Sequence, residues 1–205
     1  MGVSIRRGAA EDAAAVSATL AAAFHDDPVN TWWIPDAAER ARVLPTFFRF
    51  AFERLWLRFD EVHVADDAAG AAAWVPPRRW RLTEEEEAHL APFFVDVVAP
   101  EYLQRAGVLI GLIEERHPDE PPHWYLPCIG VRPGRQGQGV GSALLEHMTE
   151  RLDREGVPAY LEASSERNRA LYLRHGFAIR GELTLPEGPT LWLMWREPSP
   201  SQGGE

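Results

Sequence analysis

Three glycines alternate in the segment VRPGRQGQGVGSALLEHM, residues 131–148, and a helical pattern follows them at once. They are Gly137, Gly139 and Gly141, and Ser142 comes next. A chain that leaves a strand and enters a helix presents unpaired backbone N–H groups at the helix N-terminus, and such groups bind anions. Glycine lets the backbone approach a phosphate and adopt positive φ. The segment predicts a phosphate-binding loop, with a tight turn that binds no ligand as the alternative.

Three kinds of phosphate site compete for this loop. A P-loop requires G-x-x-x-x-G-K-[ST], and the chain contains no lysine. A dinucleotide-binding fold requires G-x-G-x-x-G at its first βαβ unit, whereas these glycines follow G-x-G-x-G late in the chain. Residues 136–141, QGQGVG, match the third pattern, Q/R-x-x-G-x-G/A, which holds a pyrophosphate. Arg132 and Arg135 beside the loop can add charge-assisted hydrogen bonds.

A second segment, SSERNRALYLRHGF at residues 164–177, has an asparagine at the start of a short helix, a tyrosine on that helix and a Gly-Phe pair before the next strand. These residues are Asn168, Tyr172, Gly176 and Phe177. With the glycine loop, whose pattern is that of a coenzyme A signature, this block resembles the GNAT superfamily of N-acetyltransferases. The stretches HVADD, HWYLPCIGV, EGVPAYLEA and LPEGPTLWLM extend the resemblance, in order, along most of the chain.

The resemblance implies a single α/β GNAT domain over residues 1–197, with a flexible C-terminal tail over 198–205. The implied fold is a mixed, mostly antiparallel, twisted sheet of six to seven strands, with helices on both faces and a V-shaped opening between the fourth and fifth strands. Hydrophobic periodicity is consistent with it. The periodicity predicts strands at 3–7, 61–65, 71–76, 123–131, 159–164, 177–184 and 190–196, and helices at 11–24, 38–59, from 83 onward, 101–116, from the loop to 155, and 166–175.

The resemblance also implies acetyl-CoA as co-substrate and no metal. The amides expected to hold its pyrophosphate are those of Gln136, Gly137, Gln138, Gly139, Val140, Gly141 and Ser142. The backbone of Ile129 and Val131 would pair with the pantetheine arm, as an added strand pairs with an open sheet edge. Asn168 would bond the arm from its other side.

Two residues are candidates for the proton transfers. Tyr172 takes the place of the family's general acid. A phenol with a pKa near 10 protonates a thiolate with a pKa near 8.5 only uphill, by about 1.5 units, so we expect a hydrogen bond to the developing thiolate. A packed core tyrosine is the alternative. Glu162 shares a strand face with Tyr160 and Ser164. It is a candidate general base, directly or through water, with a structural ion pair as the alternative.

The resemblance implies direct attack by a primary amine of a small molecule, and an antibiotic such as puromycin is the expected type. His25, Asp26 and Asp27 end a helix that borders the acceptor site in this family. They are alternative bases, and both aspartates are candidate substrate contacts. Trp32 and Trp33, expected in a loop, are candidates for an aromatic pocket. Acetylation of a protein or peptide amine and a non-catalytic acyl-CoA-binding module stay open as alternative functions.

The composition of the chain limits the kinds of partner and the location that we expect for it. The 205 residues include 21 basic and 31 acidic residues, a net charge of −10, which argues against general nucleic-acid binding. No stretch of about 18 apolar residues occurs, so we expect no membrane span. The single cysteine, Cys128, allows no internal disulfide, which favours a reducing, cytoplasmic location. It has no neighbouring base in the sequence, so we expect no nucleophilic role.

The acidic run at residues 84–87 is a cluster of potential metal ligands. Carboxylates in a first helical turn complement the helix dipole, and Thr83 can cap that helix. We therefore expect a helix start there and no metal site. The oligomeric state is left open.

Overall fold

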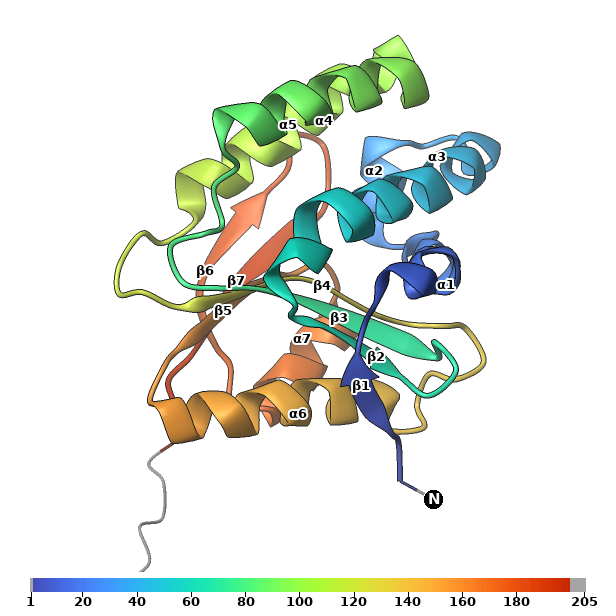
Figure 1. Ribbon diagram of the computed structural model, residues 1–205. Coiled ribbons are helices and arrows are strands. Elements are labelled where there is room, and N and C mark those ends of the chain that lie inside the picture. The colour runs from blue at the N-terminus through green and yellow to red at the C-terminus, as the bar shows by residue number, and fades with distance from the viewer. Residues whose placement is uncertain (1, 200–205) are drawn as a thin grey trace, which may run out of the picture.

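The computed structural model describes residues 2–199 (Figure 1). Seven strands form one sheet in the order β1-β2-β3-β4-β5-β7-β6. The strands are β1 (Ile5–Arg7), β2 (Val62–Ala65), β3 (Gly70–Val75), β4 (Trp124–Val131), β5 (Ala159–Ala163), β6 (Ala178–Thr184) and β7 (Thr190–Arg196). Neighbouring strands are antiparallel except β4 and β5, which are parallel. The predicted α/β sheet is confirmed, while residues 200–205 of the predicted tail lie outside the described residues.

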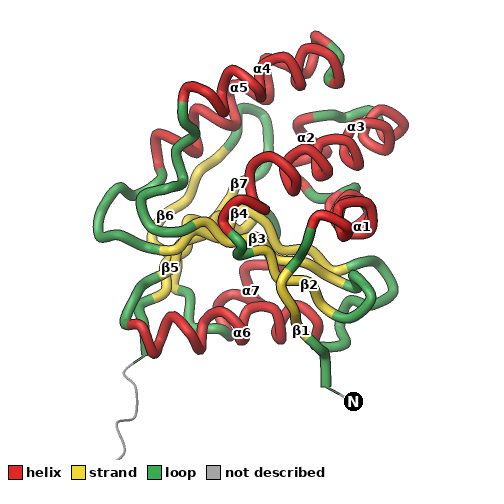
Figure 2. Tube along the Cα trace, viewed as in Figure 1, coloured by secondary structure: helices red, strands yellow, loops and turns green. Residues whose placement is uncertain are grey.

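Helices cover both faces of the sheet, as Figures 1 and 2 show. The helices α6 and α7 lie below it in these views, and the others lie above. The helices are α1 (Ala13–Phe24), α2 (Pro28–Trp33), α3 (Ala37–Phe50), α4 (Glu84–Val97), α5 (Pro100–Arg116), α6 (Val140–Glu155) and α7 (Glu166–Arg174). A 3₁₀ turn at Ala10–Asp12 precedes α1. Among the described residues, no helix has the length and apolar character needed to cross a membrane.

Helix α6 follows its sequence pattern closely. Leu144, Leu145, Met148 and Leu152 are all fully buried against the sheet, as their helical spacing predicts. Gly156 ends the helix with a φ of 68°, a conformation that glycine adopts without strain. The helix is therefore anchored along its length, and its N-terminus is held beside β4.

The predicted helix at 38–59 is longer than the α-helix observed. Helix α3 ends at Phe50, and a π-helical turn at Ala51–Trp56 and a 3₁₀ turn at Leu57–Phe59 follow. The wider turn changes the helical register. Within this turn Ala51, Phe52 and Trp56 are all buried.

Strands β4 and β5 separate soon after they meet. Only Trp124 and Tyr125 of β4 pair with β5, whereas β4 stays paired with β3 as far as Val131. The edge of β4 that faces β5 is thus open beyond Tyr125. Backbone groups on such an edge need partners, so the fold offers an extended ligand a strand to pair with. The predicted V-shaped opening is present.

Candidate active site

A cavity of about 770 Å³ occupies the opening between β4 and β5. Its walls come from the C-terminal end of α1, the open edge of β4, the glycine loop and α7. Its lining residues include Asp26, Asp27, Ile129, Val131, Gln136, Gly137, Gly139, Gly141, Ser142, Asn168 and Tyr172. Segments far apart in the sequence therefore form one site.

The glycine loop has the geometry of an anion-binding loop. Gly134, Gly137 and Gly139 have φ values of 84°, 76° and 85°, which side chains with a Cβ disfavour. Gly139 is the N-cap of α6, so the first-turn N–H groups of that helix, including that of Ser142, have no intrahelical partner. These amides and the helix dipole favour a phosphate at the cavity wall.

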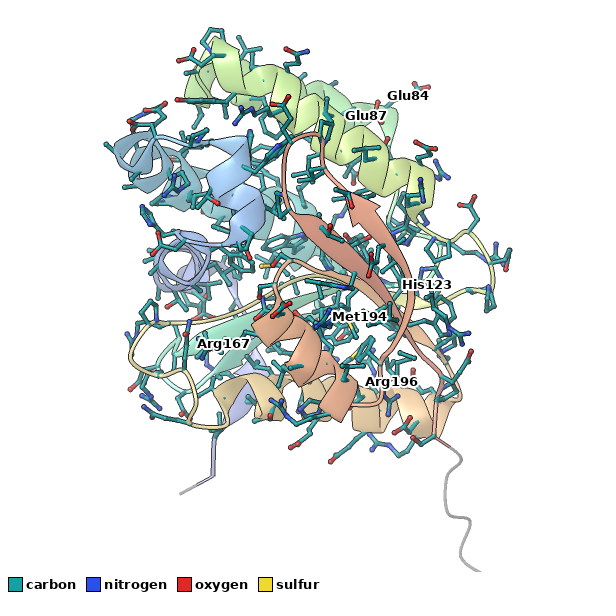
Figure 3. All side chains as sticks on the ribbon, turned by 180° about the vertical axis from the view of Figure 1, so that it is seen from behind. Glu84, Glu87, His123, Arg167, Met194 and Arg196 are labelled. Carbon is teal, nitrogen blue, oxygen red and sulfur yellow. The ribbon has the colours of Figure 1, made fainter. Side chains whose placement is uncertain are left out.

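Side chains around the loop keep it in place. The Gln136 amide donates to the Val131 carbonyl at 3.0 Å, and Arg167 donates to Gln136 Oε1 at 2.7 Å. Arg135 pairs with Asp66 at 3.3 Å. Arg167 lines the cavity and lies on α7, where Figure 3 labels it. Sequence reasoning missed Arg167, although its place next to Asn168 in the second motif was a usable signal.

Two other loop residues have different positions. Gln138 turns back, and its side chain donates to the Gly134 carbonyl at 2.8 Å. The Val140 side chain is buried in the core under α6. Neither belongs to the cavity lining, so only their backbone groups remain candidates for ligand contact. Ser142 is contacted by His175, whose Nε2 lies 3.1 Å from the hydroxyl.

Tyr172 lines the cavity on α7 and is 5% exposed. Burial raises its pKa well above the ordinary phenol value, and the negative charge of Asp27 adds to the rise. The phenol is therefore protonated at neutral pH and can donate a hydrogen bond into the cavity. The pKa of the Cys128 thiol is also raised by burial, so it does not present a thiolate.

Asp27 joins the α1–α2 corner to the end of β5. It caps α2 by accepting from the Val29 amide at 2.9 Å, and it accepts from the Ser164 hydroxyl at 2.5 Å. Burial raises the pKa of its carboxyl, which these hydrogen bonds lower in part. Asp26 also lines the cavity, but its side chain is 90% exposed and lies 2.8 Å from His25. Asp27 is the more constrained of the two carboxylates.

Glu162 lies on β5 outside the residues that line the cavity. Its side chain is 6% exposed and accepts a hydrogen bond from the Tyr125 hydroxyl at 2.9 Å. His117 Nδ1 is 3.8 Å from its other oxygen. The predicted alternation of faces along β5 is confirmed, because Tyr160 packs on the opposite side of the strand from Leu161. Sequence reasoning missed His117, because it follows α5 and the fold alone brings it to β5.

The expectation that Trp32 and Trp33 lie in a loop is wrong. Both are in α2, for which Asp27 is the N-cap and Pro28 the first residue, a pattern that favours a helix start. Trp33 is 4% exposed and packs on Phe47 and Phe94.

Trp32 links two parts of the fold. Its indole donates to the Pro186 carbonyl at 2.8 Å, which ties α2 to the turn between β6 and β7. Neither tryptophan lines the cavity. The role of the two tryptophans as substrate contacts stays a prediction.

The sequence profile of the acetyltransferase (GNAT) family matches residues 56–177, more than half of the chain. The chain belongs to the GNAT acetyltransferase family. The matched segment includes β4, the glycine loop, α6, β5 and α7, and all of these except β5 contribute to the cavity wall. This GNAT acetyltransferase is an enzyme, and acetyl-CoA is the co-substrate of its family.

Several known proteins are similar to this GNAT acetyltransferase. An uncharacterised N-acetyltransferase of Schizosaccharomyces pombe is 28% identical, over 99% of this chain and 87% of its own. A mycothiol acetyltransferase of Jonesia denitrificans is 31% identical over 59% of this chain and 42% of its own. A solved structure from Corynebacterium glutamicum, described as histone acetyltransferase HPA2 and related acetyltransferase, has a TM-score of 0.73 and 27% identity, covering 98% and 99% of the two chains.

The site fits the co-substrate of the family. Loop amides at a helix N-terminus suit a pyrophosphate, and the open edge of β4 suits an amide-bearing arm. Within residues 2–199, no group of three or more His, Cys, Asp or Glu side chains is arranged to hold a metal ion.

Proposed function

We propose that this GNAT acetyltransferase transfers the acetyl group of acetyl-CoA to a primary amine of a small molecule, by direct attack in a ternary complex. The observation that carries this proposal is the single cavity that joins the glycine loop, the open edge of β4 and Tyr172. Anion-binding amides, an unpaired strand edge and a protonated phenol are what a pyrophosphate, an amide-bearing arm and a departing thiolate require.

Backbone groups hold the co-substrate in this proposal. The amides from Gln136 to Ser142 bind the pyrophosphate, with Gln138 and Val140 contributing backbone only. Ile129 and Val131 pair with the arm through the unpaired edge of β4, and Asn168 on α7 faces them across the cavity. These contacts orient the thioester before the amine arrives, which lowers the barrier by positioning alone.

Tyr172 stabilises the leaving group. Its raised pKa makes complete proton transfer to a thiolate more unfavourable than for an ordinary phenol. The phenol therefore acts as a hydrogen-bond donor whose bond strengthens as negative charge develops on sulfur. An interaction that is stronger in the transition state than in the ground state accelerates the reaction.

The amine must lose a proton before or during attack. An α-amino group, with a pKa of about 7.7–8, has a usable neutral fraction at pH 7, whereas an alkylamine near 10.4 needs a base. Glu162 fills that role in this proposal. Asp26 and Asp27 attract the positively charged acceptor into the cavity from the α1–α2 corner, and Asp27 positions it against Tyr172.

A mass-spectrometric screen tests the proposal. The protein is mixed with acetyl-CoA and a panel of puromycin, aminoglycosides, polyamines, amino acids and short peptides, and each mixture is searched for a product one acetyl group heavier. Acetylated puromycin would support an antibiotic-resistance role, and another small amine would change only the specificity. Acetylation of peptides alone would contradict the small-molecule proposal. Binding of acetyl-CoA without any product would favour a binding module.

A further inference from the structure

Buried polar side chains surround Glu162 on the side away from the glycine loop. They come from three places in the chain: His117 follows α5, His123 and Tyr125 lie at the start of β4, and Tyr160 lies on β5. The His117 side chain is 0% exposed. Figure 3 shows His123 toward the opposite side of the molecule from Arg167. This cluster, the His117 cluster, has no part in holding the co-substrate.

Hydrogen bonds determine where the protons of the two imidazoles lie. His123 Nδ1 is 2.8 Å from the Pro121 carbonyl oxygen, which can only accept, so this nitrogen carries a proton. Neutral His123 then presents a lone pair at Nε2. His117 Nε2 is 3.1 Å from that atom and must donate to it. Neutral His117 is therefore left with a lone pair at Nδ1.

That lone pair faces a carboxylate. His117 Nδ1 lies 3.8 Å from Glu162 Oε1, and neither atom has a partner at hydrogen-bonding distance within residues 2–199. The Tyr160 hydroxyl also lacks such a partner and interacts with Glu162, whose charge adds to the raised pKa that burial gives Tyr160. Two acceptors that face each other in a buried site are unfavourable until one proton lies between them. A proton on His117 Nδ1 would convert the contact into a charge-assisted hydrogen bond.

The surroundings suit a charged imidazole. Trp80 stacks on the His117 ring, with centroids 3.9 Å apart and planes at 25°, and an aromatic face attracts a cation. The Tyr125 hydroxyl holds Glu162 Oε2 at 2.9 Å. The contacts therefore stabilise an imidazolium and a carboxylate side by side.

The cluster is connected to the cavity through one strand face. Tyr160 and Glu162 alternate along β5, and Ser164 continues this alternation directly after the strand ends. Ser164 donates to Asp27, which lines the cavity. At the other end, Tyr160 lines a surface recess of about 360 Å³ together with Pro121, the residue that accepts from His123.

We propose that His117 and Glu162 act as one unit that takes up the proton released by the acceptor amine. This inference rests on the proposed function. The N–H bond of the ammonium breaks, and its electron pair stays on nitrogen for attack. The proton moves through Glu162 to His117 Nδ1, giving an imidazolium beside a carboxylate. The Nε2 proton of His117 stays between the two imidazoles. After the product leaves, the proton on Nδ1 returns through Glu162 to water in the emptied cavity, which restores the lone pair at His117 Nδ1. His117 is a relay and positioning residue, since it acts through Glu162.

The titratable groups that face His117 determine the direction of this transfer. They are Glu162 and Tyr160 from β5, Tyr125 from β4 and His123 before β4, while Asp119 in the same connection acts on His123. Burial lowers the pKa of His123. A proton on His123 is therefore short-lived, whereas on His117 it is paired with Glu162.

Nitrogen-15 NMR of histidine-labelled protein tests the unit without any acceptor. In the wild type, acidification should add a proton at His117 Nδ1, hydrogen-bonded to a carboxylate. In Glu162→Gln, which keeps the side-chain size, this uptake should require a proton concentration about tenfold higher or more. If His117 Nδ1 stays unprotonated down to the onset of acid unfolding, or titrates identically in Glu162→Gln, the proposal is overturned.

A pair of acceptors tests the proton uptake during turnover. The variant His117→Gln should lower kcat for an alkylamine by about 100-fold, yet leave kcat for a hydrazine or aromatic amine, which is already neutral at pH 7, within about twofold. Binding of acetyl-CoA should not change. His89→Gln, which alters an exposed histidine on α4, is the matched control.

The outcomes separate the two proposals. Equal losses of kcat on both acceptors, or no loss on the alkylamine, would overturn the relay while leaving N-acetylation intact. If the wild type acetylates no amine at all, the proposed function fails, and the NMR titration alone decides whether His117 and Glu162 form a proton-holding pair.

Discussion

The Ser164 hydroxyl donates a hydrogen bond of 2.5 Å to Asp27, although 137 residues separate the two in the sequence. The bond closes the cavity between the α1–α2 corner and the end of β5. Burial raises the pKa of the Asp27 carboxyl above its ordinary value of 3.8, and the hydrogen bond from Ser164 lowers it in part.

The variant Asp27→Asn should therefore change how stability depends on pH. A carboxyl whose folded pKa is raised adds stability that is fully present below its unfolded pKa and is lost as pH rises through the folded pKa. Any stability advantage of the wild type over Asp27→Asn should be largest in acid and shrink toward neutral pH. Urea unfolding of both proteins from pH 3 to 8 measures it; a gap that grows with pH would contradict the raised pKa.

Removal of the Tyr172 hydroxyl should affect turnover and leave binding unchanged. Tyr172→Phe is expected to lower kcat by about 100-fold, because the phenol acts on charge that develops only in the transition state. The Kd for acetyl-CoA, measured by calorimetry, should stay within about twofold of the wild type. Tyr102→Phe removes a phenol from α5 outside the cavity lining and serves as the control. Equal kcat in Tyr172→Phe and the wild type would exclude Tyr172 as the donor.

Gly139, at the N-terminus of α6, has a left-handed backbone conformation that favours glycine. Gly139→Ala places a Cβ on a residue with φ of 85°, which we expect to destabilise the fold by about 1 kcal/mol and to weaken acetyl-CoA binding, since the loop amides shift. Gly107→Ala, inside α5 with no atom within 4 Å of the added Cβ, should instead stabilise by about 0.5–1 kcal/mol. Thermal melts and calorimetry of both variants check this, and unchanged binding in Gly139→Ala would count against the loop as the pyrophosphate site.

Asp153 supports the opposite end of α6. It receives two hydrogen bonds of 2.7 Å from Arg196 on β7, and these lower the pKa of its carboxyl. A depressed folded pKa gives stability that is present above the unfolded pKa and lost as pH falls through the folded value. Asp153→Asn should therefore lower unfolding free energy by about 2 kcal/mol at pH 7, with a smaller difference near pH 3. A difference that is independent of pH would refute the ion pair's contribution.

The local features of the site follow from the sequence. Alternating glycines before an apolar helical stripe specify a loop that enters a helix, because positive φ and the stripe of Leu144 and Met148 act within a few residues of one another. The same holds for Asn168 and Tyr172, four residues apart on one short helix. Such motifs predicted the loop geometry, the elements of the sheet and the two residues of α7 that line the cavity.

The tertiary structure alone decided which side chains meet. Glu162 lies beside His117 and Tyr125 only because β5 packs next to β4 and the end of α5, and the sheet register that achieves this depends on burial summed over many residues. The same dependence placed Trp33 in the core, where it packs against Phe47. Local patterns determine what each segment can do. Long-range packing determines which groups share a low-dielectric site, and proton positions depend on that choice.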